Sequence, residues 1–489
     1  MTPAPADGPP ANPVPPEPAL ERLRRMLGVP VALILGAAVW LAATPAGLSA
    51  QGQHALALFA AVFVLYLTEA IPLAITSLMV VPAAVLMDTV PVNIALGGFA
   101  SSSVWLIFGA FVLAAGMVRT RLAERITYEI LATIGCTPTR ITLGITIANI
   151  VLAFLIPSST ARTAVLLPVC LGIAAVMGGE GRTRFAINIL LTLAFTNATI
   201  GAGILTATTP NPVTIDFLAK VGQRVTYTDW LVYGFPPALL MTFATWAIIQ
   251  RVFRPEANAG EGMARDVVAQ RLASMGATTG PEWRALAVFL LVVVGWVTQA
   301  WTGFDTTVVC LVGVGLMFLP KFGMLDWVYV NRHVSWQVIL VAGGGISLGD
   351  ILMRTGAAKW LAVSIFNGLG LQTVGVLAML LALMVVIQFL HVVFVGTTAM
   401  ATAFLPIVLA LAQAAHINPL ILALPAGMII GGYPLLMFYN TLPNIIIYGT
   451  GRLRVGDFPR VGVPISLLAC LVYAACAATY WHWLGLYAG

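Results

Sequence analysis

Long apolar segments separated by short polar ones fill almost the whole chain. Apolar runs of about twenty residues, the length that a helix needs to cross the hydrocarbon core, recur from Val29 to the C-terminal end. The pattern predicts membrane segments near 29–48, 54–72, 74–90, 100–118, 141–157, 161–178, 186–215, 229–250, 285–301, 305–320, 335–353, 372–394, 399–415, 419–448 and 461–485. Several of these runs are interrupted, so we predict about eleven transmembrane helices plus broken pieces in an all-α integral membrane protein.

Composition supports this class. Hydrophobic residues make up 60% of the chain and charged residues 9%, against about 25% charged in soluble domains. A membrane barrel would show short alternating segments instead. The net charge of +6 comes from arginines in the loops, so it reports membrane topology and not a nucleic-acid partner. The five cysteines have no paired metal-ligand spacing and are interpreted as small core residues.

A polar break with two copies stands out among the apolar runs. Residues 157–168 read Pro-Ser-Ser-Thr-Ala-Arg-Thr-Ala-Val-Leu-Leu-Pro, and residues 396–406 read Gly-Thr-Thr-Ala-Met-Ala-Thr-Ala-Phe-Leu-Pro. The two align without a gap from Ser158 and Gly396 onward, at a constant spacing of 238 residues. Polar breaks at corresponding positions of two halves are a pointer to a transporter binding site.

Two further blocks recur in the same order. Gly109, Arg119 and Thr120 correspond to Gly344, Arg354 and Thr355, and Thr208, Pro210 and Asn211 correspond to Thr441, Pro443 and Asn444. We predict two membrane repeats of inverted topology, at 28–250 and 285–489. A disordered cytoplasmic tail at 1–27 precedes them and a polar cytoplasmic linker at 251–284 joins them. The alternative is a chance alignment of residues common in membranes.

Positive residues orient the chain in the membrane. Arginines gather before the first segment, in the linker and after residue 450, whereas 481–489 contain neither Lys nor Arg. Since cytoplasmic loops are rich in Lys and Arg, we predict a cytoplasmic N-terminus and an external C-terminus in the cytoplasmic (inner) membrane.

Each break can bind ions. A helix that restarts inside the membrane presents N-terminal amides that favour an anion, and the interrupted backbone frees carbonyls that can coordinate a small cation. Pro210 and Pro443, each followed by an Asn, support a second pair of breaks. The competing interpretation is that the hydroxyls only cap or pack helices.

Arg162 lies two residues beyond the first hydroxyl cluster, between apolar runs, and its counterpart in the second half is Met400. Its guanidinium suits a carboxylate, although it could instead pair with a protein group. Gln388 and His391 precede the second break; His391 could couple protons or be structural. Gly343, Gly344 and Gly345 indicate close helix packing, with a binding role as the less favoured alternative. With no phosphate-binding loop or H-E-x-x-H motif, we expect no enzyme activity.

These motifs resemble those of the divalent anion/sodium symporter family, the anion permeases that carry dicarboxylates, citrate and sulfate. In that family each half has a Ser-Asn-Thr tip and a later Pro-Asn break, matched here by 158–160 with 208–211 and by 396–398 with 441–444. The resemblance covers roughly 30–485. It implies two re-entrant hairpins, scaffold and transport subdomains, elevator-like alternating access and a homodimer.

The resemblance also implies the site. Substrate contacts fall on Ser159, Thr160, Thr208, Thr397, Thr398 and Thr441, with Arg162 added as an anion ligand. Sodium ligands fall on Ser158, Ser159 and Ala207 in one half and on Gly396, Thr397 and Asn440 in the other. The tip Asn of the family is replaced by Ser159 and Thr397. The string Ser-Ser-Thr-Ala-Arg resembles instead the family's exchangers, in which Arg162 could replace a sodium charge.

The expected function is secondary active transport of small divalent organic anions such as succinate, malate or citrate, or less favourably sulfate, coupled to Na⁺. No other cofactor and no nucleic-acid partner are expected. The alternative is sodium-independent dicarboxylate exchange. Functions of another class are an anion channel, which needs a continuous polar stripe, and a membrane-embedded enzyme, which needs paired ionisable groups at depth.

Overall fold

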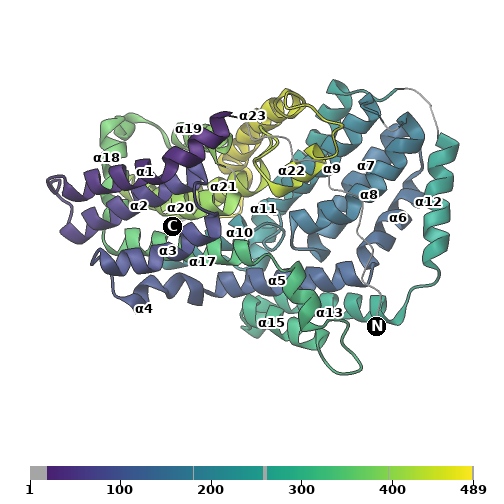
Figure 1. Cartoon of the computed structure of the whole chain (residues 1–489), viewed down its shortest axis with the longest axis horizontal. Helices are drawn as coiled ribbons and strands as arrows, with labels where there is room; N and C mark the ends of the chain where they lie inside the picture. Colours follow the sequence, from purple (N-terminus) through teal and green to yellow (C-terminus); the bar gives the residue numbers. More distant parts are fainter. Residues whose placement is uncertain (1–18, 180, 257–260, 395, 487–489) are drawn as a thin grey trace, which may run out of the picture.

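A computed structural model describes residues 19–179, 181–256, 261–394 and 396–486, and every regular element in these ranges is a helix (Figure 1). Up to the linker the elements are α1 (Ala19–Leu41), α2 (Ala50–Thr68), α3 (Leu73–Leu86), α4 (Val92–Ala95), η1 (Gly97–Ala100), α5 (Ser102–Arg119), α6 (Leu122–Ile134), α7 (Pro138–Leu155), α8 (Ser159–Gly178), α9 (Arg184–Gly201), α10 (Pro210–Lys220) and α11 (Tyr227–Val252).

The linker contains α12 (Glu261–Met275). The elements that follow are α13 (Gly280–Val297), α14 (Gln299–Thr302), α15 (Thr306–Met317), α16 (Trp327–His333), α17 (Trp336–Arg354), α18 (Ala357–Gly368), η2 (Leu371–Thr373), α19 (Val376–Val393), α20 (Thr397–Ala414), α21 (Pro419–Gly432), α22 (Leu442–Tyr448), α23 (Asp457–Ala478) and α24 (Tyr480–Trp483).

Within the described ranges, twelve helices are long and apolar enough to cross a membrane, and α3, α15 and α21 are shorter apolar helices. This confirms the predicted all-α integral membrane class, and the protein is a multi-pass membrane protein. The two long runs predicted at 186–215 and 419–448 are each divided, into α9 with α10 and α21 with α22, because Pro210 and Pro443 open new helices.

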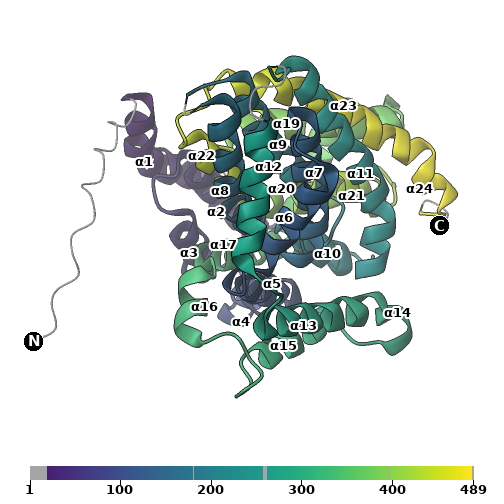
Figure 2. The same cartoon turned by 90° about the vertical axis from the view of Figure 1, so that its right-hand side faces the viewer.

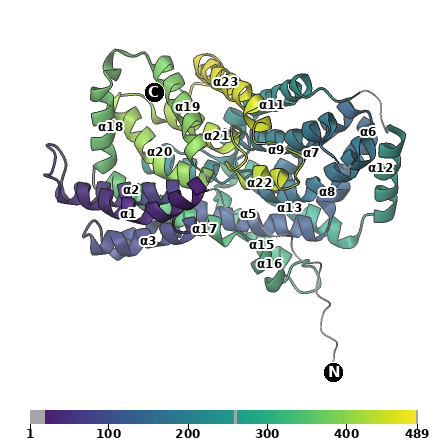
Figure 3. The same cartoon turned by 45° about the horizontal axis from the view of Figure 1, so that its top comes forward.

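Helices that border three of the breaks lie toward the middle of the molecule, whereas α7 and α8 of the first tip lie toward one end (Figures 1 and 3). α1, α2, α3 and α18 lie at one end of the long axis and α6, α7, α8 and α12 at the other, with α10, α20 and α21 between them (Figures 1 and 3). α5 extends along one side of the molecule beneath these groups and packs against α10 and α15 (Figure 1). Most buried apolar side chains form one large core that extends through both halves, and a small separate cluster lies around Ala153, Ile200, Ile204 and Ala207.

Glycines of α17 allow it to pack closely against its neighbours, as predicted. A Cβ on Gly344 would overlap the backbone carbonyl of Ser77 in α3, and one on Gly345 would overlap the side chain of Thr402 in α20. α17 therefore joins α3 of the first half to α20 without room for side chains at these two positions.

Two predicted boundaries differ from the structure. α1 begins at Ala19, inside the predicted tail, whose residues 1–18 lie outside the described part of the chain. The predicted linker is partly helical: α12 packs on α6 and α8. Arg125 of α6 fastens the end of this linker, because it pairs with buried Glu282 at 2.7 Å and donates to the carbonyls of Met275, Gly276 and Ala277.

Candidate functional site

The first tip is the short connection from α7 to α8. α7 ends at Leu155, Pro157 interrupts the helical backbone, and α8 restarts at Ser159. Ser158 caps α8, since its Oγ accepts from the backbone amide of Ala161 at 3.2 Å. The amides of the first turn of α8 thus lie at the tip.

The second tip connects α19 to α20 and is built differently. α20 begins at Thr397, and its N-cap residue Gly396 has no side chain with which to cap the helix. Thr398 instead bonds across to the other half: its hydroxyl lies 2.5 Å from the hydroxyl of Thr209. This hydrogen bond directly links the second tip to the break that precedes α10.

The later breaks are held by matching asparagines. Asn211 Nδ2 donates to the carbonyls of Gly201 (2.8 Å) and Ile204 (2.9 Å). Asn444 Nδ2 donates to those of Pro434 (3.0 Å) and Met437 (3.2 Å). Donors and acceptors both differ by 233 positions, so the two halves close their breaks with the same hydrogen bonds. Each Asn satisfies two carbonyls that the interrupted helix leaves without partners.

All four segments meet at one cavity of about 590 Å³. Of the residues predicted for the site, the structure places ten in its lining: Ser158, Ser159, Thr160, Thr208, Gly396, Thr397, Thr398, Asn440, Thr441 and Pro443. Residues more than 200 positions apart therefore share one concave surface. A volume of this size is typical of small-molecule sites.

The chemistry of this cavity favours an anion. The hydroxyls of Ser159, Thr160, Thr208 and Thr397 are partly exposed and form no hydrogen bond with any residue in the described part of the chain. They are therefore free to donate to a ligand. The N-terminal turns of α8 and α20 also border the cavity, and their amides and dipoles add positive potential.

Arg162 does not line this cavity. Its side chain is fully buried, and Nε donates to Asn197 Oδ1 at 2.6 Å. The Nη atoms donate to the carbonyls of Ile156 (2.7 Å), Asn197 (3.3 Å) and Ala207 (3.4 Å). Arg162 was predicted either to bind a carboxylate or to pair with a protein group, and the structure shows the second of these. The guanidinium bridges the first tip to the break after α9.

Most of the remaining predicted residues lie behind the lining of the cavity and stabilise it. Ala207, Pro210, Asn211 and Asn444 are buried outside its lining. Asn440 lines the cavity and also crosslinks the second half, because Nδ2 donates to the carbonyls of His391 and Phe394. Phe394 corresponds to Ile156 of the first tip. The neutral amide of Asn440 therefore donates to this carbonyl in the second half, and the guanidinium of Arg162 donates to the corresponding carbonyl in the first half.

Two further polar features lie outside the cavity, one that the sequence raised and one that it did not. His391 and Gln388 are buried in α19, and His391 Nε2 lies 3.2 Å from the carbonyl of Ile430. Residues 345–349 have the letters of the G-x-S-x-G motif, but Ser347 is buried in the middle of α17 and accepts from Gly98 N at 3.1 Å. An esterase nucleophile needs an exposed strand-to-helix turn instead.

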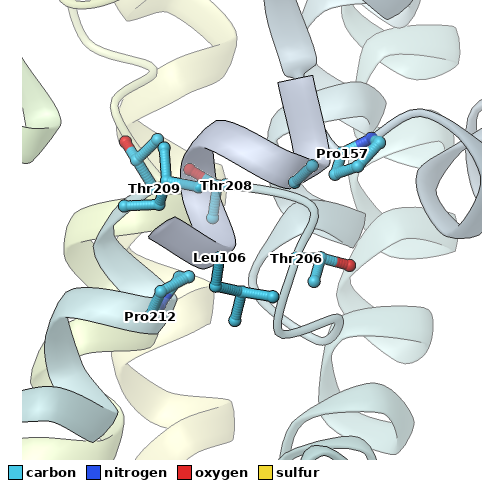
Figure 4. A pocket seen from close by; sticks show the side chains of 8 residues that line it. Leu106, Pro157, Thr206, Thr208, Thr209 and Pro212 are labelled. Atoms are coloured by element: carbon cyan, nitrogen blue, oxygen red, sulfur yellow. The ribbon is translucent and has the colours of Figure 1, made fainter. Parts of the chain in front are cut away.

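Sequence reasoning missed several lining residues. Thr209 follows Thr208 in the repeated block and could have been included on that ground. Gln337, His333 and Glu69 also line the cavity, from segments with no repeated motif. A much smaller, water-sized cavity of about 10 Å³ lies beside Pro157, Thr206 and Thr208 and borders the first break (Figure 4).

Comparisons with known proteins agree with this architecture. Residues 23–487 match the model of the family described as the sodium:sulfate symporter transmembrane region. A protein of Cupriavidus necator described only as a membrane protein is 30% identical over 90% of this chain and 89% of its own length. The sodium-dependent dicarboxylate transporter SdcS of Staphylococcus saprophyticus is 27% identical over 91% of this chain and 90% of its own length.

The putative malate transporter YflS of Bacillus subtilis is 24% identical over 94% of this chain and 96% of its own length. Among solved structures, the YdaH transporter of Alcanivorax borkumensis has a similar fold, with a TM-score of 0.54, 11% identity, and coverage of 96% of this chain and 99% of that one. With the family model matching nearly the whole chain, the protein belongs to the sodium:sulfate symporter family of membrane transporters.

Proposed function

We propose that the protein is a secondary active transporter of small di- or tricarboxylates, such as succinate, malate or citrate, with sulfate less favoured. The observation that carries this proposal is the single cavity lined by both tips, with free hydroxyls and helix N-termini. Two relatives are named for dicarboxylate and malate transport. Alternating access fits a site that lies between two halves with matching breaks.

The cavity also suggests which state the structure represents. His333, Ser335 and Val118 line it, and they belong to the end of the molecule where Arg119 of α5 pairs with Asp326 before α16. Arg271 of the linker belongs to the same end, because it pairs with Glu124 of α6, and we assign this arginine-rich end to the cytoplasmic side of the inner membrane. The structure then represents an inward-open state.

For coupling we propose one sodium position at the second tip, formed by Gly396, Thr397 and Asn440. At the first tip the carbonyl of Ala207 already accepts from Arg162, so the guanidinium competes with a sodium ion at Ser158, Ser159 and Ala207. The names of relatives, sodium-dependent transporters among them, support sodium coupling.

The test is uptake of radiolabelled succinate into proteoliposomes, with and without an inward sodium gradient and with and without internal succinate. A sodium-coupled symporter takes up succinate against its gradient without internal substrate. Absence of succinate, malate, citrate and sulfate uptake under every condition would contradict the proposed function.

Sodium-independent exchange is a second candidate, and the buried position of Arg162 favours it. A fixed positive charge at the first tip can compensate an anion without a coupling ion. If exchange is correct, uptake requires internal succinate and ignores sodium. Arg162→Gln would then lower exchange at least about tenfold, because the carbonyls lose their charged donor and the site loses one charge. Arg140→Gln, an exposed arginine of α7, is the matched control.

The quaternary and mechanical expectations are proposals of the same kind. We infer a homodimer in which a scaffold part holds a moving transport part that contains both hairpins. This rests on the resemblance of the chain to its family. Light scattering of the purified protein in detergent would give its mass and distinguish dimer from monomer.

A further inference from the structure

A second cavity, separate from the tips, lies between α5, α6, α8 and α12. Its volume is about 390 Å³. Ala164, Val165, Pro168 and Val169 of α8 form an apolar wall, and the polar lining consists of Arg121, Glu124, Tyr128 and Arg271. Figure 2 shows α12 lying in front of α6, with α8 beside it, and these three helices pack together.

The two cavities adjoin each other. Val118 of α5 and Ala164 of α8 line both of them. Along α8, Ala161 faces the tip cavity and Val165 and Pro168, further on, face the second cavity. The second cavity therefore extends the tip cavity along α8 toward the polar segment that contains α12.

The polar lining carries an excess of positive charge. Glu124 accepts from Arg121 Nε at 2.9 Å and from Arg271 Nε at 3.2 Å, so one carboxylate faces two guanidinium groups. Desolvation raises the pKa of Glu124, but the hydrogen bonds and charges of Arg121 and Arg271 lower it further, which keeps it ionised.

Both arginines keep donors for a ligand. They contact Glu124 through Nε, and the Nη groups of Arg121 donate to no residue in the described part of the chain. Arg271 lies beside the Tyr128 hydroxyl. Both side chains are about half exposed, at 50% and 52%. Arg125 differs, because Glu282 and three carbonyls occupy its guanidinium.

We infer that this second cavity is an entrance site on the cytoplasmic side of the transport path, in which Arg121 and Arg271 bind a carboxylate group of the anion as it passes Val118 and Ala164 between the tips and the cytoplasm. The inference rests on the proposed function and names a further binding site for the same substrate class. Guanidinium groups bind a carboxylate or a lipid phosphate equally well, and the connection to the tip cavity favours the soluble anion.

The test is protection of a cysteine on the apolar wall. Val165→Cys, in full-length protein whose five native cysteines are replaced, is labelled with a membrane-impermeant maleimide in neutral-lipid nanodiscs. Succinate should slow the labelling. For a weak, exposed site we expect half-maximal protection at a succinate concentration of about 1 mM. Potassium chloride at equal ionic strength should not.

Four variants of this protein separate the two sites. With Thr160→Ala and Thr398→Ala at the tips, protection by succinate should persist. With Arg121→Gln and Arg271→Gln it should disappear, and lysine at both positions should restore it in part. Arg119→Gln also removes a positive charge at this end of α5. Because Arg119 lines neither cavity, protection should remain in this variant.

Loss of protection in the tip variant, or its persistence without both arginines, would overturn the entrance site. Protection by an anionic lipid alone, with none by succinate, would assign the cavity to a lipid headgroup and also overturn it. Failure of the proposed function is a distinct result, because it would show as absent succinate transport by the wild-type protein whether or not Val165→Cys is protected.

Discussion

The hydroxyl groups at the two tips make different contacts, although the sequences of the two tips align. Ser158 is committed to capping α8, whereas Ser159 and Thr160 have free hydroxyls that line the cavity. At the second tip the hydroxyl of Thr397 is free, and the hydroxyl of Thr398 forms a hydrogen bond with that of Thr209 across the site. Thr398 therefore both binds a ligand in our proposal and couples the halves.

Thr160→Ala and Thr398→Ala are each predicted to abolish succinate uptake without loss of folded protein. Each removes a donor that faces the cavity, and a lost hydrogen bond to a charged ligand costs about 1.5–3 kcal/mol, or about ten- to a hundredfold in affinity. Uptake into proteoliposomes measures the effect, and gel filtration checks the fold.

Thr402→Ala is the control for the second tip. Thr402 also lies on α20 but is buried and does not line the cavity, and its hydroxyl donates to the carbonyl of Ala399. Its loss should leave the affinity for succinate unchanged. Normal uptake by both tip variants would show that the two tips do not form the binding site.

Among the elements, α17 depends most on the absence of side chains. The backbone of Ser77 lies against Gly344, and a backbone carbonyl cannot rotate away as a flexible side chain can. α17 connects α3 with α20, so any separation at this point displaces α20 from the first half.

Gly344→Val is accordingly predicted to lower the thermal stability of the detergent-purified protein and its yield. Overpacking of a tight interface typically costs about 1–3 kcal/mol. Gly315→Val in α15 is the matched control, since a Cβ there meets nothing within 4 Å and the position is exposed. Equal melting temperatures for the two variants would contradict the role given to Gly344.

For the whole molecule, the main expectation is that the repeats are inverted. The same asparagine bonds recur at a spacing of 233 residues, and the tips recur at 238. Inverted repeats place the outer ends of the two hairpins on opposite membrane faces.

Labelling of single cysteines by a membrane-impermeant maleimide checks this topology. Thr139→Cys and Gly181→Cys, at the ends of the first hairpin, should react from the cytoplasmic face. Thr373→Cys and His416→Cys, at the ends of the second, should react from outside. Ala273→Cys in α12 is the cytoplasmic reference. Reaction of all five from one face would exclude inversion.

Much of the lining of the tip cavity followed from the sequence, because a polar break in a long apolar run is rare and two registered copies reinforce each other. Arg162 could not be placed in this way. Its spacing from Thr160 is compatible with a side chain turned toward the cavity or away from it, and only the carbonyls of Ile156, Asn197 and Ala207 decide the direction.

By itself the sequence determined that this is a helical membrane protein with two pairs of broken segments, since apolar length and the backbone effects of Pro, Gly and hydroxyl residues act locally. Only the tertiary structure decided that the four breaks share one cavity, that Arg162 braces it from behind and that a second cavity adjoins it. These features depend on contacts between residues distant in the chain, and local patterns carry no information on how such residues meet.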